Sequence, residues 1–349
     1  LGNSGLFFAS VEDLTKSDES EFADEVFSLP PVRIAVVAHK ENDWFQESVA
    51  SFANLNYSDK QLIVLATGQT EWVEPIVSQY FPDADILEVD PEAGLGANFN
   101  QVLSSSDEPA FYLFCHHDVA LAPDALRLMV EESYRSNAAV VGPKVVNWER
   151  PNELLDVGKG MNRFAVTVQR VEAGEIDQEQ FDSVEQVFAV SNTAFLVRSD
   201  LFKALGGFDE AMGMFGEDLD FCWRAQIAGG TIMIVPGAVA RHRDESGEYQ
   251  TNPKRSRLME RHRLRSILSN YGKVKVLPML LLNLLISTVK GILGLLRGRL
   301  SNLLILADSF IWNLLNTKSL IQKRKRISEL RRVKDSEVTA LKINPSHAQ

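Results

Sequence analysis

The chain has 349 residues, of which 45% are hydrophobic and 24% charged, and it carries a formal net charge of −11. This is the composition of a globular protein with enough chain for one large domain or two smaller ones. Only two cysteines, Cys115 and Cys222, are present, which excludes a disulfide framework and favours a reducing, cytosolic setting.

The charge is spread unevenly along the chain. Residues 252–334 hold 19 Lys and Arg but 3 Asp and Glu, a balance of +16 that leaves −27 for the rest. Because this basic segment also contains long apolar runs, it indicates contact with a membrane surface. It has no helix-turn-helix and no aromatic RNA-binding pattern, so nucleic acid is not an expected partner.

The first half alternates apolar runs with segments of helical spacing. Residues 1–30 are acidic and Ser-rich and are expected to form a loose arm. Asn42 or Asp43 is the expected N-cap of the first helix. Strands are predicted at 32–38, 61–67, 85–90, 110–115 and 138–146, and helices at 42–52, 71–80, 94–103 and 122–134.

This alternation predicts right-handed parallel crossover units and a three-layer α/β/α sandwich with a mostly parallel central sheet. Ligands bind at the carboxyl ends of the strands in such sheets. The loops after Ala38, Thr67, Asp90 and Cys115 should therefore lie along one ligand-binding rim.

The second half is less regular. A strand and a helix start are predicted in 187–202, a turn, loop and helix in 206–230, and two short strands in 231–245. A basic helix at 252–272 and apolar helices at 276–300 and 302–316 follow, and then the basic cluster QKRKR (322–326). The polar or small positions of the first apolar helix share one face: Asn283, Ser287, Lys290, Gly291, Gly294 and Arg297.

That pattern favours amphipathic helices that lie in the membrane interface over helices that span it. The basic cluster would add attraction to anionic lipid. The alternative is a helical pair packed on the preceding domain or on a partner.

The motif CHHDVAL (115–121) follows an apolar strand. A carboxylate at a strand end is well placed to hold a divalent cation against a diphosphate, and Asp118 is the expected ligand. His116 can face the same site. The contiguous Cys115, His116 and His117 cannot easily converge on one zinc ion. Polar capping of the strand end is the alternative interpretation.

The motif FGEDLDFCWRA places Glu217, Asp218 and Asp220 at a predicted helix N-terminus. One carboxylate can act as a general base, and crowding by like charges would raise the pKa of one member. Alternatively, all three simply favour the positive end of the helix dipole.

Two further features are weaker. Gly94 and Gly96, at a strand-to-helix turn, allow close approach of the backbone to a ligand, with Asn98 and Asn100 as polar neighbours. A tight turn explains the same pattern. His242 follows a short apolar strand and is the candidate ligand from the second half.

The order of these motifs resembles the family 2 glycosyltransferases, which have the GT-A fold. The resemblance runs from about Val32 to Gly272. It rests on VRIAVVAHK, GLGANFNQVL, FYLFCHHDVAL, VGPKVV, FLVRSDLFKALGGFDEAMGMFGEDLDFCWRAQIAG and VPGAVARH. The tail is similar to that of an actinobacterial subgroup in which membrane-associated helices follow the transferase domain.

The resemblance implies roles for these residues. HHD stands at the family's Asp-x-Asp motif, so Asp118 and His116, completed by His242, would bind Mg²⁺ or Mn²⁺. Asp218 matches the catalytic base, with Glu217 beside it. The remaining residues are assigned by their positions: the donor nucleotide would contact Ala38, His39, Lys40, Gly94, Gly96, Asn100 and His117, and the acceptor side would include Asn192 and Trp223.

Two departures from the family pattern matter. The second strand ends in ATGQT rather than in the acidic residue that usually reads the nucleobase, so the base is not assigned. The Gln-x-x-Arg-Trp motif of processive synthases is absent, and the corresponding helix reads DFCWRAQ. This favours the addition of one or a few sugars.

The resulting prediction is an inverting glycosyltransferase that moves a sugar from a nucleotide-sugar to a hydroxyl acceptor. The expected acceptor is a cell-envelope or lipid-linked glycan. Residues 31–250 would form the GT-A domain, with a nucleotide-binding half (31–145) and an acceptor half (146–250). Residues 251–349 would be a tail bound to the cytoplasmic face of the cell membrane.

Two alternatives remain at this stage. A catalytically silent sugar- or nucleotide-binding membrane scaffold would explain the lost aspartate of the metal motif. A sugar-phosphate nucleotidyltransferase is disfavoured, because AHKEND lacks the glycines that such enzymes carry after the first strand.

Overall fold

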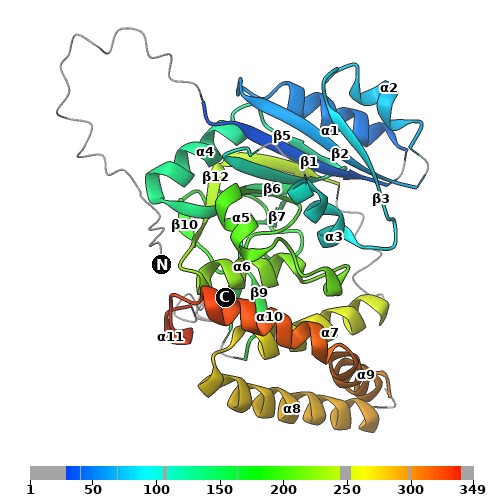
Figure 1. The fold of residues 1–349 in the computed structure, drawn as a ribbon, viewed down its shortest axis with the longest axis vertical. Coiled ribbons are helices and arrows are strands. Elements are labelled where there is room, and N and C mark those ends of the chain that lie inside the picture. The colour runs from blue at the N-terminus through cyan, green and yellow to red at the C-terminus, as the bar shows by residue number, and fades with distance from the viewer. Residues whose placement is uncertain are drawn as a thin grey trace, which may run out of the picture.

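The computed structural model describes residues 29–39, 41–68, 70–104, 108–162, 164–243, 253–297 and 300–338 (Figure 1). The predicted acidic arm, residues 1–30, lies outside the described residues except for its last two positions.

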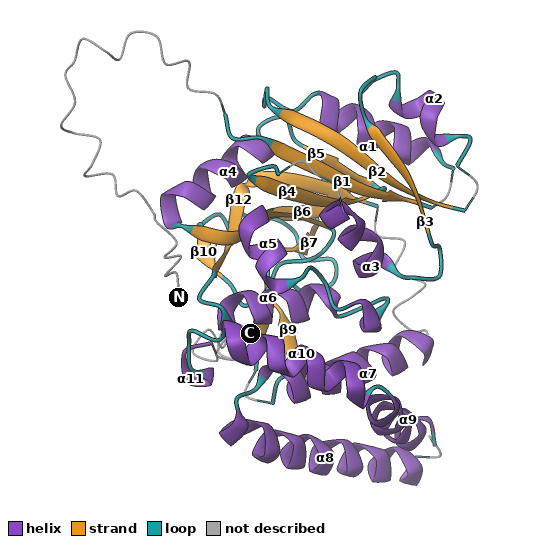
Figure 2. Cartoon of the chain, viewed as in Figure 1, coloured by secondary structure: helices purple, strands orange, loops and turns teal. Residues whose placement is uncertain are grey.

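A mixed sheet of ten strands forms the centre of the described chain (Figure 2). Its order is β10-β12-β6-β11-β4-β1-β2-β3, with β5 beside β12 and β7 beside β6. The strands are β1 (Val32–Ala38), β2 (Lys60–Thr67), β3 (Asp85–Val89), β4 (Phe111–His116), β5 (Val119–Leu121), β6 (Ala138–Asn147), β7 (Leu154–Asp156), β10 (Glu185–Gln186), β11 (Ala194–Arg198) and β12 (Thr231–His242). A separate hairpin pairs β8 (Lys159–Met161) with β9 (Thr167–Gln169).

The strand directions explain where the site forms. β3, β2, β1 and β4 are parallel, so their carboxyl ends share one edge. β11 runs antiparallel between β4 and β6, and β12 is parallel to β6. The end of β12 therefore comes to the same region as the turn after β4, where β5 pairs with β12 and sets Val119 opposite His242.

Helices cover both faces of the sheet, because successive side chains of β1 point to opposite sides. Ile34 and Val36 belong to a core shared with α1, α2 and α4, whereas Ala35 and Val37 belong to one shared with α3, α5 and α6. The helices are α1 (Asp43–Ala53), α2 (Val73–Val77), α3 (Leu95–Phe99), α4 (Ala125–Ser136), α5 (Ser199–Leu205) and α6 (Glu217–Ile227). The predicted three-layer α/β sandwich is confirmed.

Most of these helices and strands lie within a few residues of the positions predicted from the local sequence pattern. Asn42 caps α1, and its side-chain oxygen accepts a 2.9 Å hydrogen bond from the Phe45 amide. The region 231–245 differs from expectation, since it forms the single strand β12 rather than two short ones. A register shift between Val235 and Val239 absorbs the Pro-Gly interruption.

The tail forms helices that continue from the sandwich (Figure 1). They are α7 (Pro253–Asn270), α8 (Lys273–Leu296), α9 (Ser301–Leu315), α10 (Thr317–Leu330) and α11 (Asp335–Val338). Within the described part of the chain, α8 is the one helix long and apolar enough to cross a membrane. The cluster QKRKR, expected to face lipid, lies in α10 beside the sandwich, and Arg326 Nη2 donates to the carbonyls of Lys203 and Ala204.

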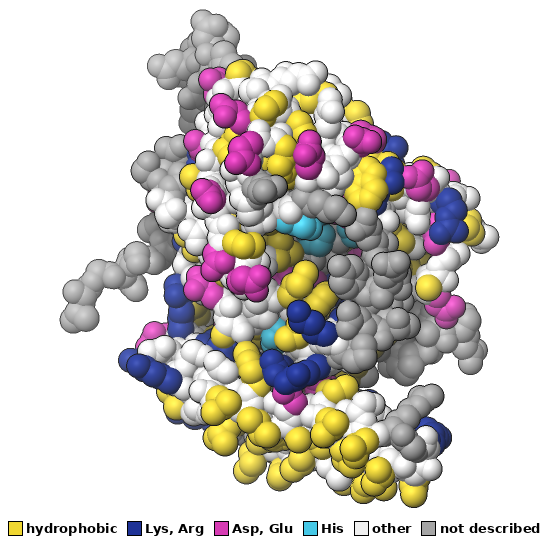
Figure 3. All heavy atoms as spheres, turned by 90° about the vertical axis from the view of Figure 1, so that its right-hand side faces the viewer, with side chains coloured by type: hydrophobic (Ala, Val, Ile, Leu, Met, Phe, Trp, Pro, Cys, Tyr) yellow, Lys and Arg dark blue, Asp and Glu magenta, His cyan; other side chains and the backbone are white. Residues whose placement is uncertain are grey.

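The polar positions of α8 partly face the protein rather than solvent. Asn283, Gly291 and Gly294 are buried, and Asn283 accepts a hydrogen bond from Arg263 of α7. The opposite side of α8 is apolar and exposed, and Figure 3 shows such side chains gathered along this edge of the molecule. Its exposed residues include Val274, Leu277, Leu281, Leu284, Leu285, Val289, Ile292, Leu293, Leu295 and Leu296.

Candidate active site

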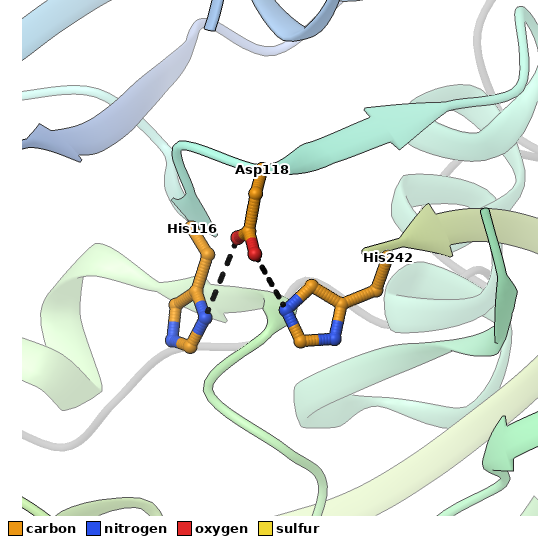
Figure 4. A group of neighbouring side chains, drawn as sticks. All are labelled: His116, Asp118 and His242. Atoms are coloured by element: carbon orange, nitrogen blue, oxygen red, sulfur yellow. Dashed lines mark ion pairs between the residues drawn. The ribbon is translucent and has the colours of Figure 1, made fainter. Parts of the chain in front are cut away.

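Three side chains from distant parts of the chain meet at the carboxyl end of β4 (Figure 4). His116 ends β4, Asp118 lies in the turn before β5, and His242 ends β12. His242 Nε2 lies 3.3 Å from one Asp118 oxygen, and His116 Nδ1 lies 4.0 Å from the other. One potential ligand atom from each residue lies within 4.8 Å of the others.

Backbone pairing fixes this group. Val119 pairs with His242 across β5 and β12, and the Arg243 amide donates to the Asp118 carbonyl at 3.3 Å. On the other side, the His116 amide donates to the Thr193 carbonyl at 3.0 Å. The two histidines are thus held on either side of Asp118 by sheet pairing.

The charges of the group suit cation binding. Burial alone would raise the pKa of Asp118, but the hydrogen bond from His242 and the neighbouring imidazoles outweigh it and hold that pKa well below its usual range. Burial lowers the pKa of His116 to about 4. At neutral pH the group therefore offers a carboxylate and a neutral His116 imidazole.

The residues fit a divalent cation. His116 Nδ1 and His242 Nε2 both face the Asp118 carboxylate (Figure 4), so an ion beside that carboxylate could contact all three side chains. Nε2 of His116, on the far side of its ring, is buried without a hydrogen-bond partner among the described residues, although unpaired buried polar atoms are rare. A carboxylate oxygen with imidazole nitrogens is a donor set used for transition-metal ions. Cys115 is absent from the group, because its side chain is buried in the core under the sheet.

A second pair of histidines lies at the ends of adjacent strands. His39 follows Ala38 at the end of β1, and its ring meets that of His117 edge to face, with centroids 4.1 Å apart. The His117 carbonyl accepts a 2.9 Å hydrogen bond from Ser48. Ala38 is fully buried, and its carbonyl accepts a 3.3 Å hydrogen bond from Thr67. Lys40 lies outside the described residues.

The predicted glycine turn contacts another loop of the protein. Gly94 has a φ of +85°, and a Cβ placed there would lie 2.5 Å from the carbonyl group of Gly213. A Cβ on Gly96 would lie 2.9 Å from Phe208 Cβ. These glycines therefore permit close packing of α3 on the loop 206–216.

The side chain of Asn100 also forms its hydrogen bonds with the loop 206–216. Its amide nitrogen donates to the Phe208 carbonyl at 3.0 Å and to Glu210 at 3.1 Å, and its oxygen accepts from the Phe208 amide at 2.8 Å. The described contacts of Asn100 thus brace the loop that leads into α6.

The first turn of α6 presents two carboxylates with different surroundings. Glu217 is 2% exposed, and its Oε1 accepts a 2.6 Å hydrogen bond from Asn192. Its Oε2 is buried without a partner among the described residues. Burial and the charge of Asp218 raise the pKa of Glu217 to about 8. Glu217 is therefore largely neutral at neutral pH.

Asp218 is held by a lysine that the sequence analysis did not single out. Lys159 Nζ, from β8, lies 2.7 Å from Asp218 Oδ2, and the Leu219 amide donates to Oδ1 at 2.7 Å. Burial would lower the pKa of Lys159, but the charges of Asp218 and Asp156 outweigh it and raise that pKa above its usual range. Because 59 residues separate the pair, no local pattern signalled it.

The structure links these features through one short segment. Thr193 pairs with the backbone of His116, and the preceding residue, Asn192, holds Glu217. The cation group and the start of α6 are thus joined across two residues. Trp223 is not part of this arrangement, since its side chain is 2% exposed and its ring packs on Phe188 and Tyr271.

Comparison with known proteins identifies the family to which the chain belongs. Residues 30–268 match the family model described as glycosyltransferase like family 2. The Pre-mycofactocin glycosyltransferase of Mycobacterium tuberculosis, in strains CDC 1551 / Oshkosh and ATCC 25618 / H37Rv, is 26% identical over 132 residues. That alignment covers 38% of this chain and 26% of the relative, so only about a quarter of the length of these curated relatives is matched.

Solved structures share the fold. GalNAc-T7 with UDP, GalNAc and Mn²⁺ superimposes with a TM-score of 0.56 at 12% identity, over 72% of this chain and 50% of that chain. Staphylococcus aureus TarS 1–349 in complex with UDP-GlcNAc gives 0.51 at 16% identity, over 73% and 71%. At these identities the likeness concerns the fold alone, and it agrees with the GT-A architecture.

Proposed function

The chain belongs to glycosyltransferase like family 2, and on that premise we propose that it transfers a sugar from a nucleotide-sugar to an acceptor hydroxyl with inversion. The observation that carries the proposal is the convergence of His116, Asp118 and His242 on the rim of the sheet. A buried carboxylate pair, Glu217 and Asp218, begins a helix joined to that rim.

The proposed cofactor is Mn²⁺ in preference to Mg²⁺. His116, Asp118 and His242 would hold the ion, and imidazole ligands suit transition metals better than Mg²⁺, which prefers oxygen. The bound ion would neutralise charge on the diphosphate leaving group. A relative of this fold was solved with UDP and Mn²⁺, which supports a nucleoside diphosphate as the first probe.

Asp218 is the proposed general base. Its two oxygens are fixed by Lys159 and by the Leu219 amide, and each retains a lone pair for an acceptor hydroxyl. Lys159 Nζ places a positive charge 2.7 Å from Asp218 Oδ2. One displacement at the anomeric carbon, with the hydroxyl proton passing to Asp218, would invert its configuration.

One observation favours the second candidate function, a catalytically silent binding protein. The side chain of Asp218 is only 10% exposed, which leaves little of it open to an acceptor. A binding protein would retain metal-dependent nucleotide affinity and would release no diphosphate from any donor.

We also propose that the protein works on a membrane surface. The exposed side of α8 is largely apolar, with Lys290 as an exposed exception near its C-terminal end. Leu304, Ile311, Leu314 and Leu315 extend this surface onto α9. Such a surface lowers its free energy by entering the acyl boundary of a bilayer. The cytoplasmic face of the cell membrane and a lipid-linked or envelope glycan acceptor fit this placement.

The test is a donor screen with the full chain in the presence of anionic vesicles. Nucleotide-sugars, including UDP-GlcNAc, are supplied with Mn²⁺, with Mg²⁺ or with a chelator, and release of the nucleoside diphosphate is measured. We expect release with at least one donor, greater with Mn²⁺, and its loss in Asp218→Asn. Tight Mn²⁺-dependent UDP binding without release from any donor would favour the silent binding protein instead.

A further inference from the structure

A lysine of the tail joins the two motif segments that surround the proposed base. Lys323 Nζ, from α10, lies 2.6 Å from Asp209 Oδ2 and 2.7 Å from Asp220 Oδ1. Asp209 belongs to the loop 206–216, and Asp220 lies on α6 two residues after Asp218. The side chains of Asp209, Asp220 and Lys323 are at most 10% exposed.

Helix α7 supplies further partners of these aspartates, and Arg224 of α6 itself adds one, its Nε lying 2.7 Å from Asp220 Oδ2. Arg265 Nε lies 2.6 Å from Asp209 Oδ2. Ser266 Oγ and Asn270 Nδ2 donate to Asp220 Oδ1 at 3.1 and 3.0 Å. Because a buried charge without a partner is costly, Asp209, which is paired with Arg265 and Lys323 of the tail, depends on α7 and α10 to remain where it is. Asp220 is held by the tail together with Arg224.

A third contact fixes the bend just before α6. His262 Nδ1, on α7, lies 2.6 Å from the Phe215 carbonyl oxygen. Phe215 and Gly216 both have positive φ, +69° and +88°, a backbone conformation that non-glycine residues rarely adopt without support from their surroundings. The entry into Glu217 and Asp218 is thus set by a contact from the tail.

We propose that Lys323, together with Arg265, is a positioning residue for the transfer reaction. It holds the loop 206–216 and the first turns of α6 in one arrangement, and so sets the place of Asp218 relative to the rim of the sheet. Helices α7 and α10 are then parts of the catalytic unit rather than an appended anchor. The proposal rests on the assignment of Asp218 as the base.

The physical argument is the pairing of charge. Burial would raise the pKa of Asp209, but Lys323 and Arg265 outweigh it and hold that pKa below its usual range. If a neutral side chain replaced Lys323, two buried carboxylates would lose the cation between them. Asp209 and α6 would then move apart or take in water, and Arg224, which donates to the Gly207 carbonyl at 2.9 Å, would remain as the link between α6 and the start of the loop.

The experiment compares Lys323→Met with Lys323→Arg and with the control Lys325→Met. Lys325 is exposed on the same helix, two residues away. Three quantities are measured on the full chain: the Kd of UDP with Mn²⁺, UDP release from UDP-GlcNAc or another donor that the wild type turns over, and amide hydrogen exchange of the 206–220 segment.

In Lys323→Met we expect turnover to fall by about 10- to 100-fold, since small displacements of a catalytic group have effects of this size. The Kd for Mn²⁺ and UDP should stay within about twofold, because the proposed cation ligands His116, Asp118 and His242 are held by β4 and β12 and not by α10. Exchange in 206–220 should rise, Lys323→Arg should recover part of the turnover, and Lys325→Met should match the wild type.

Unchanged turnover in a folded Lys323→Met protein overturns the proposal, as does a loss that equals the fraction unfolded. If no donor is turned over by the wild type, the proposed function fails. Hydrogen exchange then still decides whether Lys323 orders the loop: equal protection of 206–220 in Lys323→Met and Lys325→Met would refute it.

Discussion

Replacing Glu217 by Gln should change how the stability of the protein depends on pH. Glu217 is almost fully buried, Asn192 donates to its Oε1, and its Oε2 has no partner among the described residues. A protonated carboxyl suits this environment, because it leaves Oε1 as the acceptor and removes the buried charge. Glutamine has the same shape and the same acceptor but cannot ionise.

The pKa of Glu217 in the folded and the unfolded protein determines whether the free energy of unfolding rises or falls with pH. The pKa of Glu217 is raised from its ordinary value of 4.5 to about 8 in the folded protein. Below pH 4.5 both states bind the proton, and there is no effect. Above it the unfolded chain loses the proton while the folded protein retains it, so the free energy of unfolding decreases until the pH passes about 8.

The size of this loss in unfolding free energy follows from the difference between the pKa of Glu217 in the folded and unfolded protein. One pH unit corresponds to about 1.4 kcal/mol, so the full shift would amount to about 5 kcal/mol. The window from pH 5 to pH 8.5 captures about 4 kcal/mol of this, and relaxation of a buried site reduces it further, so we expect a difference of about 2–4 kcal/mol.

The assay is urea unfolding of the wild type and Glu217→Gln at several pH values. The free energy gained by the variant relative to the wild type should increase across this window. Glu47→Gln, at an exposed position of α1, serves as the control and should leave the curve unchanged. Parallel pH curves for the wild type and Glu217→Gln would refute a neutral, buried Glu217.

Four other predictions concern turnover, metal binding and the membrane. Asp218→Asn should reduce donor turnover by about 100-fold or more with little change in Mn²⁺–UDP affinity; comparable turnover would exclude it as the base. Lys159→Met should lower turnover by about 10-fold or more, because it removes the 2.7 Å contact that holds Asp218 Oδ2, whereas Lys159→Arg should restore much of the turnover. His242→Ala should weaken Mn²⁺ binding in titration calorimetry by about 10-fold or more, and unaltered affinity would place the ion elsewhere. Leu281→Ser with Leu285→Ser should reduce sedimentation with anionic vesicles while thermal stability is maintained, because both side chains are exposed; undiminished sedimentation would point to another membrane contact.

Local sequence patterns predicted the sandwich well because its strands and helices follow local rules. β1 is a continuous apolar run, and Asn42 caps α1 as its side chain predicts. The two strands expected in 231–245 were wrong, since sheet pairing carries β12 through Pro236 and Gly237. Tertiary pairing here outweighs the local turn signal.

The candidate site was only partly accessible from sequence. Strand order and family resemblance pointed to His116, Asp118 and His242, which the structure brings together. Lys159 escaped notice because an isolated lysine has no periodicity, and its partner lies 59 residues away. Lys323 was assigned to lipid as part of a basic cluster, yet it pairs with Asp209 at a separation of 114 residues. Long-range pairing of buried charge leaves no local signal.

The register shift in β12 limits how the gene for this protein can change in length. Between Val235 and Val239 the strand leaves its ladder with β6 and resumes it, and only then does it reach His242. Since side chains alternate across a strand, deleting one residue from this interval would reverse the faces of all that follow. Arg243, whose guanidinium now lies over Trp44, would take the place of the imidazole. Single-residue deletions there should abolish the cation site even where the fold survives.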